Sequence, residues 1–380
     1  MSRQWAIRGL ATWLTLIVLT TGCEYGEKLK DLQLIYAASL DRNDRNEIVT
    51  TIALQSPGSE ERTTPVHEVL SDAGPTVEYS MFKKVGIQVA GPIATSKNQV
   101  FLIGEQLARE DLSVVLDTLF RNSNDPLVAK VAVVQGKASD LIRLERIGSA
   151  TAGEYLRKIL VSARYETAIP EVTLHSLLPI FHDPGMDSVL PFIQKQGDRA
   201  AIKGIALMNN RRYTGVFLND TQAPVFLLLA AKKGPLCILT RKLSEETEAE
   251  GEMTGRESYI SINVDKMKRT KQVRVDQTGR VHIKLRLDLK ANVLEYPEGG
   301  LNDKARKEQL GKQLSALLQQ EAVQVASILQ QSNSDALGIG RDVMAYYPKA
   351  WEAMNWKEDY RKVKFDIQVR MKLGTHGIMN

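Results

Sequence analysis

Cysteine is almost absent from this chain, whose 380 residues include only Cys23 and Cys237. Two cysteines can form at most one bridge, so the chain is not a disulfide scaffold and must gain its stability from burial. Cys237 lies in the apolar run Pro235-Leu236-Cys237-Ile238-Leu239. This setting favours a small buried hydrophobe over a reactive thiol.

The usual signatures of catalysis are also missing. The sequence has no G-x-S-x-G elbow, H-E-x-x-H pair, Walker loop or G-x-G-x-x-G turn, which argues against the enzyme classes that these motifs define. Among the five histidines, only His175 and His182, together with Asp183 and Asp187, are candidates for a metal site. Pro179 separates the two histidines, so they do not form an i, i+4 pair on a helix. We predict no catalytic residue, no metal and no cofactor.

A strong charge of one sign and a long apolar run are lacking as well. The formal net charge is +5, which is too small to indicate a nucleic-acid-binding protein. The hydrophobic share of 43% is ordinary for a globular protein with true cores. The apolar run from Leu10 to Leu19 is shorter than the ~20 residues that a membrane-spanning helix needs.

That short run and its flanking residues have the features of a bacterial secretory signal peptide. Arg3 and Arg8 precede it, and it ends in Leu19-Thr20-Thr21-Gly22-Cys23. A lipoprotein signal peptidase needs small side chains before the cysteine, and the thiol of that cysteine accepts a diacylglyceryl group. We therefore predict a signal peptide over residues 1–22, lipidation of Cys23 and a polar tether over residues 23–30. Cleavage without lipidation is the alternative.

Residues 31–197 are predicted to form an N-terminal domain. A hairpin opens it, because residues 32–40 and 48–55 have strand patterns on either side of a polar turn. Residues 56–75 are rich in Pro, Gly, Ser and Glu and are expected to form a loop. The nearly continuous apolar run 128–134 is typical of a strand that is covered on both faces. The remaining patterns predict a strand over 99–103 and helices over 112–120, 155–164 and 174–180.

Residues 198–380 are predicted to form a C-terminal region. The main boundary is expected near residues 196–199, and the acidic segment 244–257 is a candidate for a second one. The first part of the region predicts a hairpin over 201–208 and 213–218, followed by a buried helix over 223–231.

The last third of the chain has the clearest periodicity. Residues 281–290 and 363–372 alternate between apolar and mostly cationic side chains, which is typical of strands with one buried face. Between them, residues 303–331 predict one long helix. Its apolar stripe consists of Leu310, Leu314, Leu317, Leu318, Val325, Ile328 and Leu329. These patterns predict an α+β fold with several domains and mixed sheets, in which the long helix packs across an antiparallel C-terminal sheet.

The order of several motifs resembles a known family. After Cys23 come a first hairpin, LQLIYAASLDRNDRNEIVTTIALQ, and a second one, IKGIALMNNRRYTGVFLND. The long helix then leads into SDALGIG, a helix with Tyr-Pro-Lys-Ala-Trp and the closing strand FDIQVRMKLGTHG. In this order the chain resembles the Ger(x)C family, the lipoprotein C subunits of nutrient germinant receptors in endospore-forming bacteria. Gly338 and Gly340 in SDALGIG suit a helix end and re-entry, and Trp351 and Trp356 are expected to be packing anchors.

The resemblance implies a lipid-anchored, non-catalytic scaffolding and signalling subunit on the outer face of the spore inner membrane. Its partners would be two polytopic membrane proteins, the A- and B-type receptor subunits, and the membrane itself through Cys23. The rival interpretation is a lipid-anchored solute-binding protein. That class needs two doubly wound lobes, which the predicted antiparallel sheet disfavours, and a surface hydrolase is disfavoured by the missing motifs.

Overall fold

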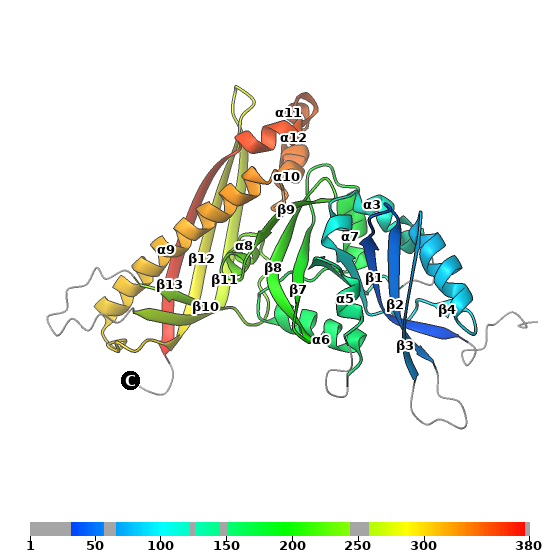
Figure 1. Cartoon of the computed structure of the whole chain (residues 1–380). Coiled ribbons are helices and arrows are strands. Elements are labelled where there is room, and N and C mark those ends of the chain that lie inside the picture. The colour runs from blue at the N-terminus through cyan, green and yellow to red at the C-terminus, as the bar shows by residue number, and fades with distance from the viewer. Residues whose placement is uncertain (1–31, 57–65, 122–125, 145–149, 244–257, 377–380) are drawn as a thin grey trace, which may run out of the picture.

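Two β-sheets, each with helices packed on it, make up the described part of the chain (Figure 1). The computed structural model describes residues 32–56, 66–121, 126–144, 150–243 and 258–376. The predicted signal peptide, Cys23, the tether and the acidic segment 244–257 lie outside these residues.

The first sheet has nine strands in the order β3-β2-β1-β5-β6-β7-β8-β9, with β4 beside β1. Its strands are β1 (Gln33–Arg42), β2 (Ile48–Ser56), β3 (Val66–Gly74), β4 (Ile93–Ala94), β5 (Val100–Gly104), β6 (Lys130–Gln135), β7 (Val189–Gln196), β8 (Arg199–Asn209) and β9 (Arg212–Leu218). The central strands β1, β5, β6 and β7 run parallel, and the short β4 is also parallel to β1. The flanking strands β2, β3, β8 and β9 pair antiparallel. A parallel centre needs helical crossovers, which place helices on the faces of the sheet.

Both faces of this sheet are covered. Val131 and Val133 of β6 belong to one core, and their neighbours Ala132 and Val134 belong to the other. The strand over 128–134 is thus buried on both faces, as its continuous apolar run predicts. The first core is covered by the π-helix η2 (Glu78–Val85), the short 3-10 helix η3 (Gly86–Gln88) beside it, α2 (Glu105–Ala108), α3 (Leu112–Val115), α4 (Asp117–Arg121) and α7 (Leu174–Phe181). The second is covered by α5 (Ser139–Ile142), α6 (Ala152–Tyr165) and α8 (Gln222–Leu229).

Two local predictions for the first sheet are wrong. Part of the loop expected over 56–75 is the edge strand β3, which pairs with β2 from Ile48↔Gly74 to Ser56↔Val66. The helix expected over 112–120 is broken into α3 and α4, because the backbone angles of Leu116, which lies between them, are not helical. The first hairpin, the strand near 99–103 and the helices near 155–164 and 174–180 are confirmed.

The second sheet has four strands in the order β10-β11-β12-β13, at the left of Figure 1. Its elements are β10 (Ile238–Lys242), β11 (Tyr259–Val275), β12 (Val281–Glu295), β13 (Lys364–His376) and the long helix α9 (Lys304–Gln331). The first three strands are antiparallel, but β13 runs parallel to β12, with Leu285 beside Ile367. The predicted antiparallel sheet is therefore mixed. The reason is that α9 carries the chain back along the sheet, so β13 starts at the same end as β12.

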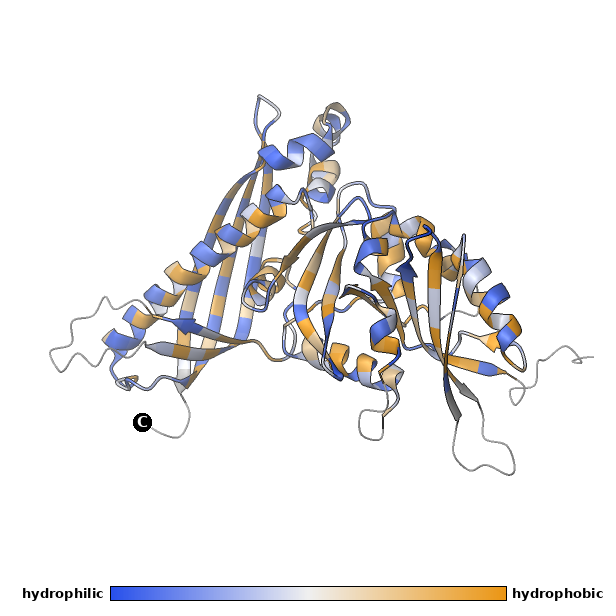
Figure 2. Cartoon of the chain, in the orientation of Figure 1, coloured by the Kyte–Doolittle hydropathy of each residue, from blue (hydrophilic) through white to orange (hydrophobic). Residues whose placement is uncertain are grey.

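Helix α9 packs along the apolar face of this sheet, as the sequence predicts (Figure 2). Its N-cap Asp303 accepts a hydrogen bond from the Ala305 N–H at 2.8 Å. Of the predicted stripe, Leu310, Leu314, Leu318, Val325 and Leu329 are fully buried, while Leu317 and Ile328 lie half-buried at its edge. A polar side chain of α9 also contacts β13: Ser315 Oγ accepts a hydrogen bond from the Met371 N–H at 2.8 Å. This contact satisfies part of the free edge of the sheet.

The two sheets share one core. A single buried cluster runs from one face of the first sheet through α8 to α9 and the second sheet. Helix α8 is buried along nearly its whole length, as expected for residues 223–231, and Cys237 is buried as predicted. The predicted boundary near residues 196–199 falls in the turn between β7 and β8, two paired strands of the first sheet. The division into domains at 197/198 stays a prediction.

Three short helices close the fold above the second sheet (Figure 1). They are α10 (Ile339–Tyr346), α11 (Pro348–Ala353) and α12 (Trp356–Asp359), followed by the 3-10 helix η4 (Tyr360–Lys362). Pro348 begins α11, a position where proline needs no N–H partner. Among the described residues, no helix is both long and apolar enough to cross a membrane.

Candidate functional site

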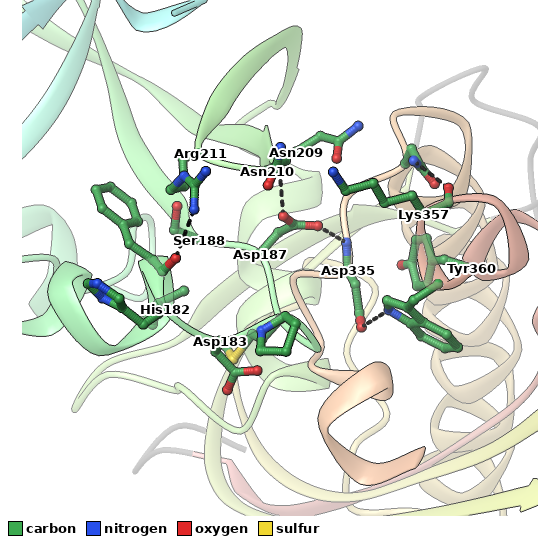
Figure 3. Close-up of a pocket in the computed structure, with 16 residues that line it drawn as sticks. His182, Asp183, Asp187, Ser188, Asn209, Asn210, Arg211, Asp335, Lys357 and Tyr360 are labelled. Atoms are coloured by element: carbon green, nitrogen blue, oxygen red, sulfur yellow. Dashed lines mark hydrogen bonds between the residues drawn. The ribbon is translucent and has the colours of Figure 1, made fainter. Parts of the chain in front are cut away.

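Two turns that are distant in the sequence meet where the first sheet approaches α10 and α12. We call this place the junction and define it by residues 182–188, 209–211, 333–342 and 356–360. The Asp187 N–H donates to the Asp335 carbonyl oxygen at 3.0 Å, and the Asp335 N–H donates to Asp187 Oδ2 at 2.9 Å. Asp187 Oδ1 accepts from the Asn210 N–H at 2.7 Å. One carboxylate thus links the β8–β9 turn to the segment after α9 (Figure 3).

The Asp335 carboxylate is buried at the centre of the junction, with 2% exposure. Oδ1 accepts from the Ile339 N–H at 2.8 Å, and Oδ2 accepts from the Gly340 N–H at 2.7 Å and from Trp356 Nε1 at 3.1 Å. Two of these donors belong to the first turn of α10, where backbone N–H groups lack helical partners. Asp335 therefore satisfies the start of α10 and fixes the Trp356 ring against it.

Glycines allow the two turns to approach this closely. Gly338 has a φ of 64°, a conformation that favours glycine. A Cβ on Gly340 would lie 2.5 Å from Trp356 Nε1 and 2.9 Å from Gly185 Cα. The Arg341 N–H donates to the Gly185 carbonyl oxygen at 2.8 Å. The predicted role of both glycines of SDALGIG in re-entry and close approach is confirmed.

A cavity of about 400 Å³ opens at the junction (Figure 3). We call it the junction cavity. Its lining residues are Ile180, Phe181, His182, Asp183, Pro184, Met186, Asp187, Ser188, Asn209, Asn210, Arg211, Asn333, Asp335, Trp356, Lys357 and Tyr360. Residues from both sides of the predicted boundary near 196–199 therefore line one cavity. Its size lies within the range of small-molecule sites, ~300–1,000 Å³.

Three buried polar atoms that belong to residues lining this cavity have no hydrogen-bond partner among the described residues. They are Ser188 Oγ, Asn333 Oδ1 and Tyr360 Oη. The exposed fractions of the three residues are 3%, 9% and 1%. An unsatisfied buried polar atom costs about 1–3 kcal/mol, so their gathering at one cavity calls for a physical reason.

The residues that the sequence raised as a metal site are used differently. Asp187 holds the junction, and the Asp183 carboxylate pairs with Arg341 through Nε at 2.6 Å. His182 places Nδ1 2.9 Å from the Leu178 carbonyl oxygen, at the end of α7. Within the described ranges, no group of three or more potential metal ligands is found. Cys23, the predicted lipidation site, lies outside those ranges.

Comparison with known families gives two matches that together span nearly the whole chain. Residues 26–195 match the spore germination protein N-terminal domain. Residues 203–377 match the spore germination B3/GerAC-like C-terminal domain. The chain belongs to this spore germination family. The resemblance to Ger(x)C proteins is thereby confirmed, and the two matches meet around the β7–β8 turn.

Individual relatives of the germination family resemble the chain over almost all of its length. Spore germination protein GerQC of Bacillus cereus is 20% identical over 371 residues, which cover 96% of this chain and 99% of the relative. Spore germination protein KC of Bacillus subtilis strain 168 is 22% identical over 391 residues, covering 96% of this chain and 94% of the relative. The crystal structure of the GerBC protein aligns with a TM-score of 0.58 and 14% identity, over 88% of this chain and 96% of that one. The fold is therefore shared with GerBC.

Sequence reasoning did not find most of the junction cavity of this germination protein. It placed Asp335 in a family motif without predicting a buried carboxylate, and it passed over Ser188, Asn333 and Tyr360. The polar run Ser332-Asn333-Ser334-Asp335 directly after a long amphipathic helix is a signal that such a search could use. The residues that surround the cavity come from positions far apart in the sequence, and only the fold brings them together.

Burial gives the junction a testable pH dependence. Burial of the Asp335 carboxylate raises its pKa from 3.8 to about 7, although the three N–H groups that donate to it act in the opposite direction. Between these pH values the folded chain holds a proton that the unfolded chain has released, so the contribution of Asp335 to the free energy of unfolding falls as the pH rises. Burial raises the pKa of Asp187 as well.

Asp335→Asn, which cannot titrate at this position, isolates the effect. We expect the unfolding free energy of the parent, relative to the variant, to be greater at about pH 5 than at about pH 8. Urea unfolding of both proteins at the two pH values measures this difference. A difference that does not change with pH would show that Asp335 stays ionised in the folded chain.

Proposed function

We propose that this germination-family chain is the lipid-anchored, non-catalytic C subunit of a nutrient germinant receptor. The family match over residues 26–195 and 203–377 carries the proposal. The signal-like start that ends in Cys23 supports the anchor. In this function the chain acts with two polytopic subunits, of A and B type, on the outer face of the spore inner membrane, where the receptor senses small nutrients and triggers germination.

The anchor has a physical purpose in such a receptor. A single acyl chain binds a membrane only marginally, whereas the two chains of a diacylglyceryl group give stable attachment. Attachment at Cys23 confines the folded body to the membrane surface and raises its effective concentration beside its partners. Modest contacts with the polytopic subunits are then sufficient for assembly.

A scaffolding role fits the chemistry of the junction. The Asp335 oxygens accept three N–H groups, and those of Asp187 accept two backbone N–H groups. Carboxylates bound in this way hold the backbone together. This use favours a structural role for them over one in acid–base catalysis.

Metabolic labelling with radioactive palmitate tests the anchor. We expect the full chain, produced in a spore-forming bacterium, to carry label and to sediment with membranes. Cys23→Ala should abolish the label because it removes the acceptor thiol, while its folded body keeps the thermal unfolding of the parent. Cys237→Ala is the matched control, since Cys237 is buried in the core, and it should keep its label. An unlabelled parent, or label that persists in Cys23→Ala, would contradict the proposed anchor.

A further inference from the structure

We propose that the exposed face of the second sheet binds the headgroups of an anionic lipid bilayer and holds the folded body against the membrane by its charge. We call this surface the cationic face. It is formed by five rows of outward-pointing side chains across three strands: residues 266, 268, 270, 272 and 274 of β11, residues 282, 284, 286, 288 and 290 of β12, and residues 364, 366, 368, 370 and 372 of β13. The proposal depends on charges of the folded body and not on the thiol of Cys23. It can therefore fail while the proposed anchor holds, and the anchor can fail while this proposal holds.

The alternation of the strands places these side chains on one side of the sheet. The apolar residues between them belong to the core that α9 and α8 cover, and α9 packs along that apolar side (Figure 2). Residues that alternate with the core point the other way. Lys266, Lys290 and Lys372 are accordingly exposed. The cationic face is thus the side of the sheet opposite α9.

Positive charge is concentrated on this face. It carries nine Lys or Arg residues and two Asp residues. Its excess of seven cations is larger than the excess of five in the whole sequence, so the rest of the chain is slightly acidic. Asp265, in the bulge of β11 at the border of the face, lowers this excess only to six. The two Asp residues already have partners on the face, because Asp288 pairs with Arg286 at 3.0 Å and Asp366 with Lys284 at 3.8 Å.

The first row of the cationic face sets three lysines side by side. Lys266 lies opposite Lys290, and Lys290 lies opposite Lys372. Neighbouring strands are ~4.8 Å apart, and like charges placed directly opposite each other destabilise a sheet. The free protein therefore contains an unfavourable arrangement, which becomes favourable when negative charge lies over it.

The composition of the face favours a lipid surface over other polyanions. Six of its nine cations are lysines, which act as flexible point charges, whereas arginine supplies planar groups for bidentate binding. Lysine is depleted at protein–protein interfaces. The five rows contain no Phe, Tyr or Trp on which the bases of a single-stranded nucleic acid could stack.

The shape of the face agrees with a broad, flat partner. None of its residues lines the junction cavity or the cavities of about 90 and 920 Å³ elsewhere in the described part of the chain. An exposed array of lysines suits a plane of anionic headgroups, near which each Lys or Arg strengthens binding about fivefold.

Sedimentation with lipid vesicles tests the proposal. The protein is the full chain carrying Cys23→Ala, so that no diacylglyceryl group contributes to binding. One set of vesicles is phosphatidylcholine alone, and in the other a third of the lipid is phosphatidylglycerol. The neutral vesicles measure any binding by the apolar run from Leu10 to Leu19, which does not depend on lipid charge. We expect at least about tenfold stronger binding to the anionic vesicles at low salt, and a weaker preference as the Debye length falls from ~10 Å at 0.1 M salt to ~3 Å at 1 M.

Neutralising the lysine row places the lipid on this face. In the same Cys23→Ala chain, Lys266→Gln, Lys290→Gln and Lys372→Gln together should weaken binding to anionic vesicles about 100-fold, or to the level of neutral vesicles where this is reached first. The same changes remove the like-charge contacts within the row. The triple variant should therefore unfold at the temperature of its Cys23→Ala parent or at a higher one, so that loss of binding does not reflect loss of the fold.

Three lysines on the first sheet supply a matched control. Lys97, Lys137 and Lys195 are exposed and lie outside the cationic face. Changing all three to Gln lowers the net charge of the chain by the same amount. We expect this variant to keep its affinity for anionic vesicles to within about threefold, because charges away from the bound surface are screened.

Three results would overturn the proposal. The first is equal binding of the Cys23→Ala chain to anionic and neutral vesicles at low salt. The second is an equal loss of binding in the two triple variants, which would show that net charge and not this face attracts the lipid. The third is tighter binding to polyglutamate than to anionic vesicles at the same concentration of negative charge, which would assign the face to an acidic protein partner instead.

Discussion

Asp335→Ala is expected to lower the free energy of unfolding by about 3–5 kcal/mol. The substitution removes the acceptor of the Ile339 N–H, the Gly340 N–H and Trp356 Nε1. All three donors lose their partner at a site with 2% exposure, and each such loss costs on the order of 1–3 kcal/mol. Urea unfolding followed by tryptophan fluorescence measures the change, because Trp351 and Trp356 are the only tryptophans after residue 22.

Asp366→Ala is the control for this prediction. Asp366 is exposed on β13, and within the described part of the chain it forms an ion pair with Lys284 at 3.8 Å. An exposed pair of this kind contributes about 0–1 kcal/mol, so the variant should unfold almost like the parent. If Asp335→Ala were as stable as Asp366→Ala, the Asp335 carboxylate would not be what holds α10 and Trp356 at the junction.

Ile367→Asp is expected to unfold the second sheet. Ile367 is 4% exposed, lies beside Leu285 of β12 and belongs to the core that α9 covers. The change removes apolar contacts and buries a carboxylate, which together cost on the order of 5 kcal/mol. Circular dichroism and tryptophan fluorescence should show loss of the cooperative unfolding transition of this region.

The neighbouring residue supplies a matched control for the face assignment. Gln368 lies on the opposite face of β13, beside Arg286 of β12. Gln368→Asp introduces the same carboxylate one position along the strand, where a cation and solvent can accommodate it. We expect it to unfold like the parent. Equal stability of Ile367→Asp and Gln368→Asp would show that the two faces of β13 had been assigned the wrong way round.

Much of the fold could be predicted because burial of one face of a helix or strand produces a regular spacing of apolar residues in the sequence. Strict alternation identified the buried faces of β12 and β13, including Ile367, and the stripe beginning at Leu310 identified the face of α9. The continuous apolar run around Val131 identified a strand with two covered faces. Each of these patterns is local, so it can be recognised without knowing which elements pack against the segment.

The wrong predictions arose where a partner decides the structure. Residues 66–74 lack a strong strand pattern but form β3 because β2 offers an unpaired edge. The direction of β13 depends on the length and path of α9, which alternation along β13 does not encode. The break at Leu116 interrupts an apolar stripe that looks continuous in the sequence.

The sequence by itself determined which family this chain resembles and which faces of its long helix and final strands are buried, and it carries the prediction of lipid attachment at Cys23. These properties depend on residue order and local period. Only the tertiary structure decided that Asp187 and Asp335, separated by 148 positions, meet at one junction, and that Ser188, Asn333 and Tyr360 line one cavity there. The physical reason is that burial and hydrogen bonding at these positions depend on residues distant in the sequence, which become neighbours only when the chain folds.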